Sequence, residues 1–175
     1  QIGLALNMYA NDNSENFPGY TDSTTTTSTT ELNSLGNLFD AYITDRKVFR
    51  CTSDTGVSET SVLTLTTGTS TFTVSTCSYG YDDNHKATDD PGVAIAADAR
   101  GTSTTNFLSD NHATKGQNVL YLDGHVEWKG TTTCGYYGTS YDNIYAIGTT
   151  YSARPYDTSS TGNNTTKGTE TAIMQ

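Results

Sequence analysis

Two short apolar arms flank a turn-forming pair at residues 118–128, where the sequence reads Asn118-Val-Leu-Tyr-Leu-Asp-Gly-His-Val-Glu-Trp128. Asp-Gly is the pair best suited to a two-residue hairpin turn with positive φ at both positions. The alternation therefore predicts an antiparallel hairpin in which Tyr121 lies opposite Val126. In this register the residues predicted to face the core are Val119, Tyr121, Val126 and Trp128. The residues on the opposite face are Leu120, Leu122, His125 and Glu127.

Helical periodicity precedes the hairpin at two places. Residues 1–10 place apolar side chains on one broad face, and the polar run that follows, with Pro18 and Gly19, ends the helix. Gln1 is a poor N-cap, so we expect this helix to be the lower part of a longer one. A second helix is predicted from the capping-box pair Ser28 and Glu31 to Ile43. The face of the first helix consists of Ile2, Leu4, Leu6, Met8 and Tyr9.

Strand-like and loop-like segments fill the rest of the chain. Residues 62–66, 71–75 and 93–97 are rich in β-branched or small apolar residues, and they predict sheet strands. Residues 21–30 have no apolar member and predict a flexible Thr-rich loop, while residues 157–170 predict a Thr-, Gly- and Asn-rich loop or arm. The 175 residues suffice for one domain, residues 1–175, of the α+β class.

Composition excludes several classes of partner. Only 33% of the residues are apolar and 16% charged, whereas 35 Thr and 16 Ser supply the polar surface. The net charge of −10 opposes binding to nucleic acid, because no counterion release would drive it. No run approaches the length of a membrane span. The abundance of Thr, Tyr, Gly and Asn is typical of extracellular or cell-surface proteins.

An ordered series of short motifs resembles a known family. The series comprises residues 1–13, Phe17-Pro18, Val48-Phe-Arg-Cys-Thr-Ser-Asp54, Ser78-Tyr-Gly-Tyr81, Ala97-Asp98, His112 and residues 118–128. It resembles the prepilin-type proteins with a His, nine-residue gap, Asp-Gly signature, which are relatives of pseudopilins and type IV pilins. Here the gap from His112 to Asp123 holds ten residues, Thr52 replaces the usual Pro, and the cleavage site and long apolar helix are missing. The resemblance implies an N-terminal helix packed on an antiparallel sheet, and a role in an extracellular filament.

The chemistry of His112 admits two interpretations. Its side chain can hydrogen-bond backbone groups and fix its loop, or it can join Asp98, Asp123 or His125 around a metal. Loop locking is favoured, because a transition metal needs several converging imidazole or thiolate ligands and the three histidines lie on different segments. Asp-Gly is likewise explained by the turn alone. The predicted loop-locking signature is Asp98, His112, Asn118, Asp123, Gly124 and His125.

Carboxylates and cysteines supply the remaining candidate sites. Calcium binds carboxylate oxygens on flexible loops, so Asp82, Asp83, Asp89 and Asp90 form a possible calcium site, although such residues are often merely solvated. The cysteines can form one disulfide with an odd thiol or remain three core thiols. We predict a Cys51–Cys77 disulfide, with Cys134 free or paired between subunits.

These observations favour a structural protein without catalysis. The expected subunit assembles with copies of itself through the first helix and a Tyr-rich surface in the last third of the chain. The alternative is a secreted binding module, possibly calcium-dependent, whose aromatic and hydroxyl-rich loops hold carbohydrate or another surface ligand. Apart from possible calcium, no cofactor is expected.

Overall fold

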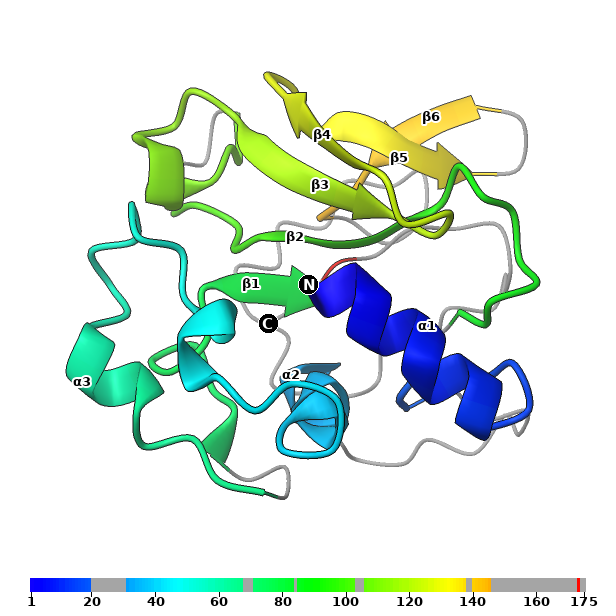
Figure 1. The fold of residues 1–175 in the computed structure, drawn as a ribbon. Coiled ribbons are helices and arrows are strands. Elements are labelled where there is room, and N and C mark those ends of the chain that lie inside the picture. Colours follow the sequence, from blue (N-terminus) through cyan, green and yellow to red (C-terminus); the bar gives the residue numbers. More distant parts are fainter. Residues whose placement is uncertain are drawn as a thin grey trace.

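A four-stranded antiparallel sheet in the order β1-β2-β3-β4 forms the centre of the computed structural model, which describes residues 1–19, 31–67, 71–83, 85–102, 106–137, 140–145 and 173 (Figure 1). Its strands are β1 (Tyr79–Tyr81), β2 (Ala94–Asp98), β3 (Gln117–Tyr121) and β4 (Val126–Lys129). A separate hairpin consists of β5 (Thr133–Tyr137) and β6 (Ser140–Asn143). The helices are α1 (Ile2–Asp12), α2 (Glu31–Leu35) and α3 (Glu59–Val62), with 3-10 turns η1 (Gly36–Leu38), η2 (Arg46–Phe49) and η4 (Asp110–His112). The fold is therefore α+β, with a small N-terminal helix and an antiparallel sheet.

The central strands β2 and β3 are covered on both faces, whereas β4 is exposed. On one face α1 packs against β3, and a Cβ atom added to Gly3 would lie 2.8 Å from Cδ1 of Leu120, so the helix approaches closely. On the other face Val119 and Tyr121 pack with Ile144 and Tyr145, close to the β5–β6 hairpin (Figure 1). This double covering explains why β2, the predicted buried run at 93–97, is apolar until its final residue.

The second helix is shorter than the sequence predicts. It ends at Leu35, continues as η1, and gives way to a turn in which Asp40 has a φ of 70°. Glycine is a poor helix former, and a Cβ atom at Gly36 would lie 2.8 Å from Phe72. The apolar side chains from Leu32 to Ile43 are buried nonetheless, so their spacing indicated burial correctly and helix length wrongly.

The strands predicted at 62–66 and 71–75 are absent. Val62 ends α3, whose N-cap Ser58 accepts a hydrogen bond from the backbone N–H of Ser61. In the second run the Thr76 hydroxyl donates to the Thr71 carbonyl at 2.6 Å and accepts from the Thr73 N–H at 2.9 Å. Threonine side chains that bond to local backbone compete with sheet pairing, and this explains the turns found here.

The β3–β4 hairpin forms in a register one residue away from the predicted one. Leu120 pairs with Val126 and Val119 with Glu127, and the Tyr121 N–H donates to the His125 carbonyl at 3.0 Å. The loop therefore has three residues, 122–124, and Gly124 takes the left-handed position with a φ of 91°. The predicted two-residue turn is wrong, and Val126 and Trp128, predicted to face the core, are exposed.

Two further expectations concern the Thr-rich segments and a membrane span. The Thr-rich segments predicted at 21–30 and 157–170 lie outside the described residues. None of the helices in the described ranges has the length and apolar character that a bilayer span requires.

Replacing Gly124 by Val should lower the free energy of unfolding by roughly 1–2 kcal/mol, because a β-branched residue resists the left-handed conformation. A Cβ atom there has open space around it, with Asn7 Nδ2 at 3.9 Å, so the cost is conformational. Gly124→Asn is the control, since Asn tolerates positive φ. Urea unfolding that gives equal stability for the two variants would contradict this account of the turn.

Candidate functional site

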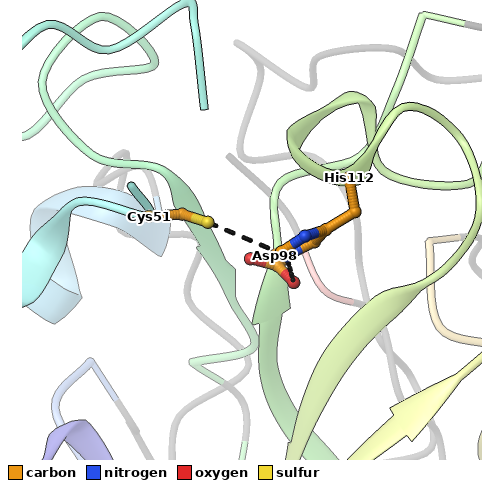
Figure 2. A group of neighbouring side chains, drawn as sticks. All are labelled: Cys51, Asp98 and His112. Carbon is orange, nitrogen blue, oxygen red and sulfur yellow. Dashed lines mark hydrogen bonds and ion pairs between the residues drawn. The ribbon is translucent and has the colours of Figure 1, made fainter. Parts of the chain in front are cut away.

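Three segments distant in the sequence bring Cys51, Asp98 and His112 together (Figure 2). Cys51 lies shortly after η2, Asp98 ends β2, and His112 ends η4. The short η4 turn begins at Ser109, whose hydroxyl accepts from the Asn111 N–H, and ends where Ala113 adopts a left-handed φ of 54°. This tight turn holds the imidazole of His112 at the end of the central strands.

The polar atoms of the cluster converge on one point. Nε2 of His112 lies 3.0 Å from Oδ2 of Asp98 and 3.7 Å from Sγ of Cys51. One ligand atom from each residue lies within 4.8 Å of the others. Asp98 is only 1% exposed, whereas Cys51 and His112 are half-buried. Among the residues that the structure describes, this is the one group with such geometry.

Asp98 has the richest set of polar contacts in the cluster. Oδ2 accepts from the backbone N–H of Asn118 at 2.7 Å and from its side-chain amide at 3.1 Å. Oδ1 faces the amide of Asn111 at 3.3 Å, and that amide also donates to the Ser78 carbonyl at 2.9 Å. Together with His112, these contacts hold the end of β2 against β3 and the η4 loop. Three members of the loop-locking signature, Asp98, His112 and Asn118, thus lie in one network.

The geometry differs from that of a nucleophilic relay. In a Cys-His-Asp relay the thiol and the carboxylate contact different nitrogens of the imidazole, so that the ring passes a proton between them. Here both approach Nε2. Burial also raises the pKa of the Cys51 thiol, which disfavours the reactive thiolate. The arrangement is suited to holding the loop or a cation.

The rest of the predicted signature forms a separate, exposed turn. The His125 N–H donates to Asp123 at 3.0 Å and lowers the pKa of that carboxyl. The His125 ring stacks on Tyr121 with centroids 4.4 Å apart. Asp123, Gly124 and His125 therefore shape the hairpin end and do not join Asp98 and His112.

A groove of about 700 Å³ runs between the N-terminal end of α1 and the sheet. Asp98 and Asn118 line it, so the groove borders the cluster. Its wall also carries the basic residues Lys47 and Arg50 and the apolar residues Leu4 and Val126, among others.

The four aspartates predicted to bind calcium have separate partners. Asp82 and Asp89 flank the buried His85, with carboxylate oxygens 3.2 Å and 3.3 Å from its two ring nitrogens. Asp83 accepts from the Ser34 hydroxyl at 2.7 Å, and Asp90 accepts from the Gly92 N–H at 2.8 Å. The structure therefore gives these carboxylates separate partners and does not gather them around a common point, and the calcium site stays a prediction.

Burial of the same acidic region changes the ionisation of two carboxyl groups. Desolvation, together with the nearby charges of Asp83 and Asp82, raises the pKa of Glu31 from 4.5 to about 7. Desolvation likewise raises the pKa of Asp83 to about 6. Both carboxyl groups therefore keep their protons to a higher pH than solvated carboxyl groups do.

The predicted disulfide is not formed. No bond joins Cys51 to Cys77, because the two thiols point to different surroundings. Sγ of Cys77 is buried and contacts the Tyr79 carbonyl at 3.7 Å, whereas Sγ of Cys51 faces His112. The third cysteine, Cys134, is a buried thiol that contacts the Thr131 carbonyl at 3.4 Å.

The predicted assembly helix divides into two faces. Leu6 is fully buried against the sheet, with Ile2 and Tyr9 packed partly against the same core. Leu4 and Met8, on the opposite side of α1, are 68% and 44% exposed.

Cys51 is the member of the cluster that sequence reasoning missed. We assigned it to a disulfide, although the alternative set for His112 already contained Asp98. The available signal is the short sequence Phe49-Arg-Cys51, which places a thiol at the end of a turn, but no spacing relates it to residues 98 and 112.

Comparisons of the chain with models of protein families, with curated proteins and with solved structures returned no match.

Replacing Asp98 by Ala should lower the free energy of unfolding by about 2–4 kcal/mol, because the buried side-chain amide of Asn111 and the backbone N–H of Asn118 lose their acceptor. Urea unfolding measures the loss, with a chelator present to keep out stray metal ions. Asp123→Ala is the matched control, since Asp123 also contacts a histidine but is exposed. A loss for Asp98→Ala no larger than that for the control would refute the structural role of Asp98.

Replacing Glu31 by Gln should make stability less dependent on pH. The pKa of Glu31 is higher in the folded chain, so its protonated form favours folding and the stability it contributes is lost as pH rises from about 4.5 to about 7. Gln cannot ionise, so the variant should gain up to about 3 kcal/mol over the native chain at pH 8 and little at pH 4. Unfolding curves of the two proteins that shift in parallel with pH would contradict this.

Proposed function

We propose that the chain is a structural subunit without catalytic activity that assembles with copies of itself into an extracellular pilus-like or pseudopilin-like filament. The order of its sequence motifs and the packing of an N-terminal helix on an antiparallel sheet support the proposal. The observation that carries it is the apolar character of α1 on both sides.

A helix that covers one sheet needs only one apolar face. The inner face of α1 packs against Leu120 and the rest of the core, whereas Leu4 and Met8 project outward. Val126, which is 62% exposed, lines the same groove as Leu4. Contiguous apolar surface of this kind is typical of protein interfaces. We call Leu4, Met8 and Val126 the outer apolar surface.

Charge favours a second copy as the occupant of this surface. Lys47 and Arg50 line the groove at the N-terminal end of α1 together with Asp45, and Lys47 also forms an ion pair with Glu59, although the chain carries a net charge of −10. At the C-terminal end of the helix, Asp12 and Glu15 are exposed. The helix dipole has the same polarity, positive at the first end and negative at the second. Two copies placed head to tail therefore bring opposite charges together.

Head-to-tail contacts have a structural consequence for assembly. They join different surfaces of the two copies, so that every added subunit leaves a new site open, and they build filaments unless the rotation closes a ring. The net charge of −10 must be screened at such contacts, and the Debye length of about 8 Å at physiological salt provides that screening.

The double variant Leu4→Ser, Met8→Ser should reduce self-association, because it removes the outer apolar surface of α1 and leaves the inner face intact. Sedimentation velocity and electron microscopy at physiological salt measure the loss. Leu63→Ser is the matched control, since Leu63 is 53% exposed on the segment after α3. Association of the double variant equal to that of the control, or a native chain that stays monomeric at high concentration, would overturn the proposal.

The head-to-tail orientation is tested by charge exchange in the same assay. Lys47→Glu should weaken association, and adding Glu15→Lys to that chain should restore part of it, because the exchanged charges again oppose one another between copies. Further weakening by the second change would refute this orientation.

A further inference from the structure

Three potential metal ligands, Cys51, Asp98 and His112, converge on one point at the end of β2. Nε2 of His112 carries at most one proton, yet it faces the carboxylate of Asp98, the sulfur of Cys51 and the amide of Asn118, the last at 3.3 Å. When Nε2 donates to Asp98, to which the Asn118 amide also donates at 3.1 Å, the same nitrogen cannot accept a hydrogen bond from the Cys51 thiol. A cation at the common point would bind the nitrogen, the carboxylate oxygen and the sulfur together.

We propose that Cys51, Asp98 and His112 form a binding site for one divalent transition-metal ion, with zinc as the best match. Zinc bonds to sulfur at about 2.3 Å and to nitrogen and oxygen at about 2.0–2.2 Å, so tetrahedral ligand atoms lie roughly 3.3–3.6 Å apart. The separations here are 3.7 Å from sulfur to nitrogen and 3.0 Å from nitrogen to oxygen. The sulfur and the carboxylate oxygen lie within 4.8 Å of each other, so the side chains must rotate to bring all three atoms to bonding distance of one ion.

The mixture of ligands decides the class of metal. Thiolate and imidazole suit zinc and other borderline or soft ions, whereas calcium and magnesium take oxygen ligands only. This composition also distinguishes the site from the calcium site predicted at the aspartates, which lies on other residues.

The surroundings of the ligands are ordered as metal sites require. The amides of Asn111 and Asn118 fix the carboxylate of Asp98. The ring of His112 packs edge-on against Trp128, with centroids 5.1 Å apart. Outer contacts of this kind orient ligands and are worth 10- to 100-fold in metal affinity.

The site has a path to solvent and room for one more ligand. Three protein ligands leave one position of a tetrahedron, and water can reach it because Cys51 and His112 are only half-buried and Asp98 borders the groove. Bound metal would also join the segment after η2 to β2 and η4, and so stabilise the fold by its binding free energy. This inference is independent of the proposed assembly.

Cobalt(II) is the probe for the ligand set, because its absorption reports tetrahedral geometry and bonding to sulfur. The full chain, reduced and freed of metal by a chelator, should bind one cobalt ion with a sulfur-to-metal band, and zinc should displace it. Cys51→Ser should lose that band, and His112→Ala should weaken zinc binding at least about 100-fold, beyond the effect of outer contacts. Cys134→Ser and His125→Ala are the matched controls, which should bind as the native chain does.

A measurement on the native chain keeps the test valid if a variant does not fold. Zinc should protect Cys51 from alkylation, with mass spectrometry locating the label, because Cys51 is the least buried of the three cysteines. Unchanged alkylation of Cys51 under saturating zinc, a cobalt spectrum without a sulfur band, or equal loss of binding in the matched controls would each overturn the site.

Discussion

The buried carboxylate of Asp98 is the interaction on which the centre of the molecule depends. It ends β2, the strand that pairs with both β1 and β3, and it accepts from the backbone of the neighbouring strand at Asn118. A buried carboxylate is costly without partners, so the surrounding amides and imidazole must keep their positions. The η4 loop, the strand end and the segment of Cys51 are therefore fixed relative to one another by one side chain.

Sequence patterns predicted those parts of the fold in which local and tertiary preferences agree. The apolar spacing of residues 2–9 identified α1, the run at 93–97 identified β2, and Asp123-Gly124 located the hairpin. Asp98 and His112 were also placed from the sequence in one predicted set, the loop-locking signature. In each case one physical requirement, a buried face or a turn residue, determined the pattern.

The other predictions failed where two physical effects compete. Threonine favours strands on average, yet the hydroxyl of Thr76 bonds to its local backbone and stabilises a turn. Asp-Gly suits loops of two or three residues, and the structure has the longer one, with Gly124 in the left-handed conformation. The position of Cys51 depends on contacts between residues far apart in sequence, for which a single chain carries no local signal.

The three-residue loop makes the chemical character of a whole surface depend on the length of one turn. Because side chains alternate along a strand, removing one residue between Tyr121 and His125 would turn β4 over. Val126 and Trp128 would exchange sides with Glu127, and an exposed apolar surface would become an acidic one. A single codon inserted or deleted at this turn would thus change the chemical character of an exposed surface in one step.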